Sequence, residues 1–199
     1  MKKVVVLLCL WVSVVLVSGA SARDIQKGSI EIDGIMDVSF LKGKSKAIGS
    51  YETETEEYSV AFSNYYYIEK NIGAGLFCDY GKSERNAPSG YGDTLTTEAT
   101  SYLVGPVIKY QYSLADQINI YLNGGAGMAR LRSKNNYYAV KGKGTGWKIS
   151  AGLSFFLKKS IALNLQLERS SIEIKMDDIN SHLDVNDTSL RVGASVYID

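Results

Sequence analysis

Apolar and polar side chains alternate along most of the chain after residue 28. Between Ile30 and Phe40, the even positions are mainly apolar, and the residues between them are mainly acidic or small. Successive side chains of a strand point to opposite faces, so this segment predicts a strand with one apolar and one polar face. The pattern returns seven more times. Those segments lie at about 58–68, 72–80, 102–112, 118–128, 147–157, 161–167 and 190–198.

The connections between these segments are of two kinds. Three are short, at 69–71, 115–117 and 158–160, and each is followed directly by an isoleucine. Those isoleucines are 46 and 43 residues apart, which indicates one hairpin repeated along the chain. The other connections, 41–56, 82–100, 132–144 and 174–188, are longer and polar. Short turns at one end and long loops at the other predict an all-β, eight-stranded, antiparallel up-and-down transmembrane barrel.

A soluble β-sandwich also produces alternation, with its apolar faces turned inward. Two features favour the membrane barrel. The predicted strands are longer than the five or six residues, roughly, of an average strand, and the polar face carries charges near strand midpoints, as a polar barrel interior does. Aromatic residues also gather near both ends of the predicted strands, where membrane interfaces favour them. Pro106 lies inside one strand and predicts a bulge or a local gap in its ladder.

The N-terminus has the pattern of a secretory signal peptide. Lys2 and Lys3 precede an apolar run from Val4 to Val17, and small residues ending in Ala22 follow. The run is short for a retained membrane anchor, which needs about 17–25 residues. We therefore predict a signal peptide over residues 1–22 and a barrel domain over residues 23–199.

Composition narrows the choice of partners. Loss of Lys2 and Lys3 with the signal leaves 20 of the 22 basic residues against 21 acidic ones, so no strongly basic domain is available to bind nucleic acid. Cys78 would be the only cysteine left, which excludes an internal disulfide. The 19 glycines and 14 tyrosines, against two prolines, favour strands.

Charged residues on the polar faces form the main candidate site. An eight-stranded barrel is just wide enough for side chains to fill its interior, so charges that point inward must pair. Such pairs would either plug the lumen or form a gate that opens when they exchange partners. Glu168 and Arg191 lie on neighbouring predicted strands at similar heights. The predicted interior charges are Glu31, Asp33, Asp37, Asp79, Lys109, Lys148, Glu168 and Arg191.

Several motifs resemble those of small outer-membrane β-barrel proteins of the OmpA/OmpX type, also called porin-family proteins. They are the segment Leu103–Tyr110, the repeated Tyr-x-Ile/Leu turns and the C-terminal strand. The resemblance extends from about residue 28 to the end, and it implies an outer-membrane location in a Gram-negative envelope. It also implies an assembly signal, read by the barrel-assembly machinery, at Arg191, Gly193, Val196 and Ile198. Family members usually end on an aromatic residue, whereas this chain ends on Asp199.

Enzymes with a similar barrel, the lipid A deacylases and palmitoyl transferases, use a histidine together with a serine and an acid. Here His182 is the only histidine, and Leu183-Asp184 follows it where the deacylase pattern has His-x-Ser. We therefore expect no catalytic residue. We also expect no cofactor and no metal site, because the acidic residues of the last long loop lack the regular spacing of a calcium site.

These observations predict a non-enzymatic outer-membrane barrel with a plugged polar interior, which contributes to envelope integrity or surface contact through its long loops. A narrow, low-conductance porin is the alternative, and a lipid A-modifying enzyme is the third. The expected partners are outer-membrane lipid, lipopolysaccharide, the barrel-assembly machinery and an extracellular molecule bound by the loops, with no nucleic acid. The protein is expected to be a monomer.

Overall fold

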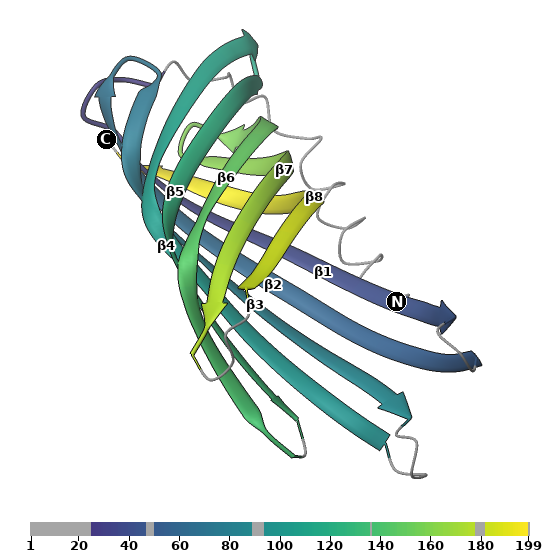
Figure 1. Ribbon diagram of the computed structural model, residues 1–199. Helices are drawn as coiled ribbons and strands as arrows, with labels where there is room; N and C mark the ends of the chain where they lie inside the picture. The colour runs from purple at the N-terminus through teal and green to yellow at the C-terminus, as the bar shows by residue number, and fades with distance from the viewer. Residues whose placement is uncertain (1–24, 47–49, 89–93, 136, 178–181, 199) are drawn as a thin grey trace.

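The computed structural model describes residues 25–46, 50–88, 94–135, 137–177 and 182–198. The predicted signal peptide lies outside these residues. The described chain forms eight strands in one closed barrel, in which each strand pairs with its neighbour in sequence and the last pairs with the first (Figure 1). The strands are β1 (Ile30–Lys46), β2 (Ser50–Glu69), β3 (Ile72–Pro88), β4 (Thr94–Ala115), β5 (Ile118–Asn135), β6 (Ala139–Lys158), β7 (Ile161–Met176) and β8 (His182–Ile198).

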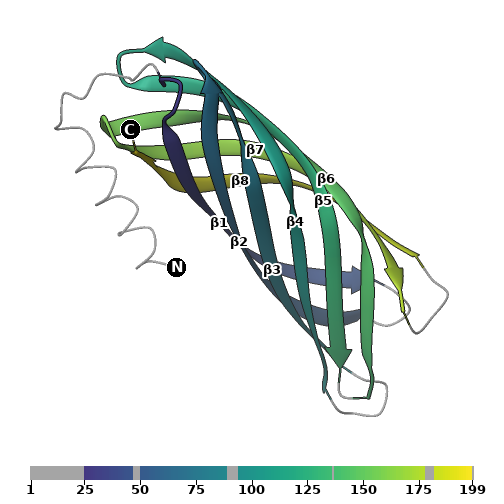
Figure 2. The same ribbon diagram turned by 90° about the vertical axis from the view of Figure 1, so that its left-hand side faces the viewer.

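The antiparallel up-and-down barrel predicted from the alternation is confirmed. All eight strand pairs are antiparallel, and the strands run steeply tilted around the barrel (Figure 2). Most of the exposed large apolar side chains lie on the outward face of the strands, so the half of the barrel nearer the short turns is apolar outside and contains most of the buried polar residues inside. Among the described residues, no helix has the length and apolar character needed to span a membrane.

The strands are longer than the sequence predicted, and the expectation of four long loops is wrong. The strands contain 16 to 22 residues, whereas about 9–11 residues suffice to cross a bilayer. Most of the expected loop residues, such as Arg132–Asn135 and Lys141–Gly144, continue the ladder. Glycine, asparagine and lysine are depleted in strands, so these segments look like loops in sequence. They nevertheless form strand outside the membrane, where neither face needs to be apolar.

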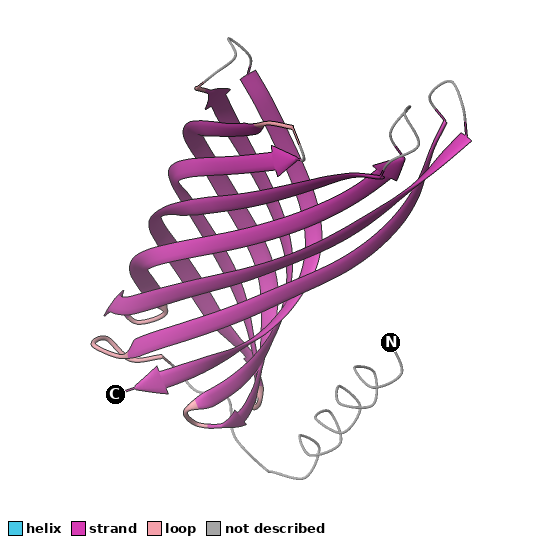
Figure 3. Ribbon diagram, turned by 90° about the horizontal axis from the view of Figure 1, so that it is seen from below, coloured by secondary structure: helices cyan, strands magenta, loops and turns pink. Residues whose placement is uncertain are grey.

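The three short connections share one geometry, which confirms the repeated hairpin. Each has two residues between strands, one fewer than expected, and a shift in register next to the turn. The carbonyl of the last turn residue accepts a hydrogen bond from the backbone of a strand in the next hairpin. These bonds are Gln111 N to Asn71 O, Phe156 N to Gln117 O and Tyr197 N to Ser160 O, and Tyr67 N to Ser29 O is the equivalent at the N-terminal end. Figure 3 views this arrangement of strands and turns from below.

The segment before β1 closes the short-turn end of the barrel. Ile25 is fully buried in a cluster that includes Tyr67, Phe156 and Tyr197. Its carbonyl accepts a hydrogen bond from the backbone of Asn71. Lys27, which is exposed outside the strands, lies 3.0 Å from Glu69, whose hydrogen bond raises the pKa of Lys27.

Pro106 leaves a local gap in the ladder, as its sequence position predicted. Between β4 and β5, register pairs stop at Val104 and resume at Val107 without a shift. Gly105 fits this gap because a Cβ there would collide with the carbonyl oxygen of Ala126. On its other side, Pro106 pairs normally with β3.

Candidate functional site in the barrel interior

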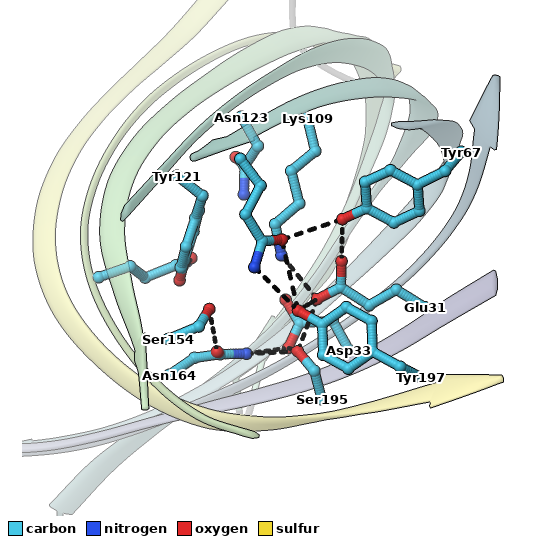
Figure 4. Close-up of polar contacts among 12 residues, drawn as sticks. Glu31, Asp33, Tyr67, Lys109, Tyr121, Asn123, Ser154, Asn164, Ser195 and Tyr197 are labelled. Carbon is cyan, nitrogen blue, oxygen red and sulfur yellow. Dashed lines mark hydrogen bonds and ion pairs between the residues drawn. The ribbon is translucent and has the colours of Figure 1, made fainter. Parts of the chain in front are cut away.

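Two groups of charged side chains occupy the lumen, and the lower one is centred on Glu31. Its carboxylate lies 2.6 Å from the ammonium of Lys109, which reaches across from β4, and both side chains are fully buried (Figure 4). An isolated buried ion is costly, so each of these groups requires the other. The pair therefore ties β1 to the far wall of the barrel.

Hydroxyl groups complete the surroundings of Glu31. Tyr67 donates a hydrogen bond to one carboxylate oxygen over 2.7 Å, and Ser195 and Tyr197 donate to the other over 2.7 and 2.9 Å. Charge-assisted hydrogen bonds of this kind are stronger than neutral ones. Glu31 thus binds side chains from β2, β4 and β8 at once.

Asp33 lies two residues further along β1 than Glu31, on the same inward face, and belongs to the same hydrogen-bonded network. Its carboxylate accepts a 2.9 Å hydrogen bond from the amide of Asn164, whose carbonyl in turn accepts one from Ser154. No cation forms an ion pair with Asp33 among the described residues. The lower network is Glu31, Asp33, Tyr67, Lys109, Gln111, Ser154, Asn164, Ser195 and Tyr197.

The upper network lies further along the strands toward the long-strand end. Lys148 is 2.8 Å from Asp79, and Glu168 is 2.9 Å from Arg191. Lys148 also lies 4.0 Å from Glu168, which joins the two pairs into a chain that crosses the lumen from β3 to β8. Gln166 donates a 3.1 Å hydrogen bond to Glu168 from below. These five residues define the upper network.

Aromatic rings fill the space between and around the networks. The ammonium of Lys109 lies 4.3 Å from the ring centre of Tyr121, and that of Lys148 lies 4.2 Å from the ring centre of Phe77. Tyr65 and Phe77 are almost completely buried. Cations over aromatic faces are attracted by the ring quadrupole, so these rings partly replace the lost water. The lumen is therefore packed with side chains at both levels.

Above the upper network the lumen widens into a vestibule of about 320 Å³. Asp79 and Arg191 line it, together with inward-facing apolar residues that include Leu103, Leu131 and Ile172. Three glycines of β6, Gly142, Gly144 and Gly146, face inward beside this apolar wall. The vestibule is thus open space on the outer side of the upper network.

The structure brings together seven of the eight interior charges named from the sequence. Glu31, Asp33 and Lys109 meet in the lower network, and Asp79, Lys148, Glu168 and Arg191 meet in the upper one. The side chain of Asp37 lies outside what the structure describes, although its backbone belongs to β1.

Sequence analysis missed the inward aromatic and apolar residues, because it described the inner face as small or polar. That description is wrong for Tyr65, Tyr67, Phe77, Tyr121, Phe156 and Tyr197, which are all buried inside. In Tyr65-Tyr66-Tyr67 three consecutive tyrosines conceal the alternation. The inward position of these rings could have been predicted from spacing, because each lies an even number of residues from an inward polar residue of the same strand, as Tyr197 does from Ser195.

The residues of the predicted assembly signal lie on β8, which closes the barrel. The side chain of Arg191 faces inward, and Val196 and Ile198 face the lipid side. Gly193 packs against the backbone of Gly34 on β1. Their recognition by the assembly machinery stays a prediction. His182 is exposed at the start of β8, opposite Lys175.

A closed barrel with an apolar outer face and a polar, side-chain-filled lumen defines the class of transmembrane β-barrels of the outer membrane. A family model described as "outer membrane protein beta-barrel domain" matches residues 8–197. The chain belongs to this family, and it is an outer-membrane protein.

Several solved structures share this fold. The outer membrane protein OprG of Pseudomonas aeruginosa superimposes with a TM-score of 0.57 at 12% identity, covering 88% of this chain and 98% of its own. Neisserial surface protein A has a TM-score of 0.51 at 14% identity, covering 86% and 97%. Ail, the attachment invasion locus protein of Yersinia pestis, has a TM-score of 0.50 at 15% identity, covering 87% and 100%. No curated protein matches the chain.

Proposed function

We propose that this protein is a non-enzymatic outer-membrane barrel with a closed lumen, which acts in envelope integrity or surface contact. The observation that carries the proposal is the upper network, in which Asp79, Lys148, Glu168 and Arg191 span the lumen beneath the vestibule. The lower network lies beneath it as a second layer. A lumen filled at two levels leaves the outer surface as the part that can meet other molecules.

The strand extensions provide that surface. They carry β2 to β5 well beyond the length that crosses a bilayer, so the outer end of the barrel is a wall of paired strands. Ail, one of the similar structures, is an attachment invasion locus protein by its name, which supports a contact role for this fold. The partner we propose is an extracellular molecule that binds this wall of strands, with the protein present as a monomer.

Conductance in planar lipid bilayers tests the closed lumen. The purified protein is expected to give no stepwise current. Asp79→Ala and Arg191→Ala are expected to be silent too, because the lower network still fills the lumen in each variant. Steady current from the unaltered protein would overturn the proposal.

A narrow porin is the second candidate, and the vestibule above Asp79 and Arg191 is the observation that favours it. In that case the upper network would act as a gate. Current steps that appear only in Asp79→Ala or Arg191→Ala would support the gate over the plug.

Shortening the outer hairpins tests the contact role. Removing residues 132–141 of β5 and β6 shortens the wall while leaving the lipid-facing parts of both strands in place. We expect loss of surface adhesion or of envelope resistance to detergent, with the barrel still folded. Unchanged surface phenotypes after all four outer hairpins are shortened would contradict this role.

A further inference from the structure

Basic side chains gather on the outward face of β5, β6 and β7, directly above the apolar surface. We call this set the cationic rim. All of its members are exposed, and they come from three adjacent strands. They are Arg130, Arg132, Lys141, Lys143 and Lys175.

The register places these cations directly opposite one another. Arg130 pairs with Lys143, and Lys143 pairs in turn with Lys175. Arg132 pairs with Lys141 in the next row. Like charges at directly opposed positions destabilise a sheet, so three such pairs in one small area are an unfavourable arrangement for the isolated barrel.

Acidic groups compensate for this arrangement only at its edge: exposed Asp177 lies opposite Lys141, and its backbone NH donates a hydrogen bond to the Lys141 carbonyl, whereas the other four cations have no carboxylate directly opposite in the described strands. Among the described residues, none of the five cations forms an ion pair with a carboxylate. Glu173, on the same outward face, lies opposite Thr145, and its other neighbour across the sheet is Asp184. His182 lies opposite Lys175, and nearby Lys134 is paired with Glu98 over 3.4 Å.

Three further acidic residues form a row on β2, β3 and β4. Glu56, Glu84 and Glu98 are directly opposed across β2, β3 and β4. β5 and β6 contain no acidic residue, so basic charge is concentrated on the outer ends of these two strands. A general solubilising surface would mix charges of both signs, so this concentration indicates an anionic neighbour on that side of the barrel.

The position of the cationic rim relative to the membrane indicates which anionic molecule it meets. On β5, eleven residues from Ile118 to Met128 cover the membrane crossing, and Arg130 is the next outward residue. Met128 is 75% exposed immediately below it. On β6, Trp147, a residue type that favours the membrane interface, is exposed two outward positions below Lys143. The rim thus faces sideways, at the level where acyl chains give way to headgroups.

We propose that the cationic rim binds the phosphate groups of a phosphorylated glycolipid of the outer leaflet, such as the lipid A part of lipopolysaccharide. Its acyl chains lie along Met128 and the apolar face of β5 and β6, and its phosphates relieve the repulsion between Arg130, Lys143 and Lys175. This inference goes beyond the closed barrel proposed above, and it holds whether or not the lumen conducts.

Titration of the protein in zwitterionic detergent micelles with purified lipopolysaccharide tests the proposal, with Trp147 fluorescence as the readout. We expect saturable binding. Arg130→Gln with Lys143→Gln should weaken it about 10- to 30-fold, since each basic residue contributes about 1 kcal/mol at an anionic surface. The exchange Arg130→Lys with Lys143→Arg should retain binding. Lys158→Gln with Lys159→Gln, an equal loss of charge at the other end, should change it less than about 2-fold.

Chemical variants of the probe separate the sources of phosphate. Lipopolysaccharide stripped of its phosphates should bind as weakly as the Gln double variant does. Equal binding by the unaltered and Gln variants, or undiminished binding of the dephosphorylated probe, would overturn the proposal. Inorganic phosphate or a soluble sulphated polysaccharide that competes at equal anion concentration would also overturn it, in favour of a soluble anion.

Discussion

At the scale of single residues, the packing of the lumen depends on paired charges, and removing one member of a pair is more costly than removing both. Lys109 faces Glu31 at 2.6 Å, and Asp33 lies beside them with hydrogen bonds but no ion pair of its own among the described residues. Removal of Lys109 alone or of Glu31 alone leaves the other member of the pair buried without compensation, whereas removal of both leaves neither. The two kinds of variant should therefore differ strongly.

Lys109→Met should lower the free energy of unfolding by about 3–5 kcal/mol, because Glu31 is then buried without its cation. The double variant Lys109→Met with Glu31→Gln should be more stable than the single one. Urea unfolding in lipid vesicles measures both. Effects of the two substitutions that simply add would contradict a direct coupling.

Sequence reasoning found the interior charges because an ionisable residue on a polar strand face has few alternatives in a narrow barrel. It did not find which charges pair, apart from the neighbours Glu168 and Arg191. Lys109 and Glu31 come from β4 and β1, and Lys148 and Asp79 from β6 and β3. These strands are not adjacent, so only the curvature of the closed barrel brings their side chains together.

At the scale of elements, the turns and the glycine contacts determine where strands can pair. Asn71 ends the first hairpin with a φ of 66°, in the left-handed region that asparagine and glycine tolerate best. Its carbonyl also accepts the bond from Gln111. A β-branched residue there would strain the turn and disturb the next hairpin.

Asn71→Val should therefore destabilise the barrel by about 1–2 kcal/mol, while Asn71→Gly should be neutral within about 0.5 kcal/mol. The comparison uses urea midpoints of the folded, membrane-inserted protein. A valine variant as stable as the glycine variant would show that the turn conformation is not the constraint.

The gap in the β4–β5 hydrogen-bond ladder beside Pro106 leads to a second prediction about the strands. A Cβ at Gly105 would collide with the carbonyl of Ala126, whereas a Cβ at Gly124 would make an ordinary contact 3.7 Å from the carbonyl of Lys148. Gly105→Ala should lower stability by more than about 1 kcal/mol, and Gly124→Ala should not. Thermal unfolding of the two variants in detergent gives the comparison, and equal losses would contradict the close approach.

The strand ends show where element prediction from sequence reaches its limit. Inside the membrane the apolar face must be continuous, so alternation identifies each strand there. Beyond it, segments such as Lys141–Gly144 pair through their backbones without any requirement on hydrophobicity. The sequence pattern of these segments therefore resembles that of a loop, and only the strand register shows that they extend the barrel wall.

At the scale of the whole molecule, the seam between β1 and β8 is the weakest part of the closed sheet. It contains seven register pairs, from Ile30 to Met36, whereas the other seams contain 15 to 17. The lower network crosses this seam through the hydrogen bonds that Ser195 and Tyr197 donate to Glu31. Side chains thus reinforce the seam where backbone pairing is shortest.

The intact barrel should survive detergent electrophoresis and migrate differently before and after boiling, because closure protects every ladder within the membrane. Substitution of Ser195 by Ala and Tyr197 by Phe should lower the temperature at which the folded band is lost, because the seam then loses its bonds to Glu31. Tyr121→Phe, which removes a buried hydroxyl away from the seam, is the control. A single band at all temperatures would argue against a closed barrel in the membrane.

The hairpin geometry at the short-turn end has a consequence for how such a molecule can change size during evolution. The three hairpin turns offer the strand that follows each hairpin the same carbonyl, at Asn71, Gln117 and Ser160, and Ser29 offers one to β2 in the same way. A duplicated hairpin inserted between two others would find the same acceptor on one side and present the same acceptor on the other. Adding a whole hairpin would therefore preserve these backbone hydrogen bonds and disturb only the packing of side chains in the lumen. Filling the larger interior, and not pairing the strands, would then limit the evolution of a barrel with more strands.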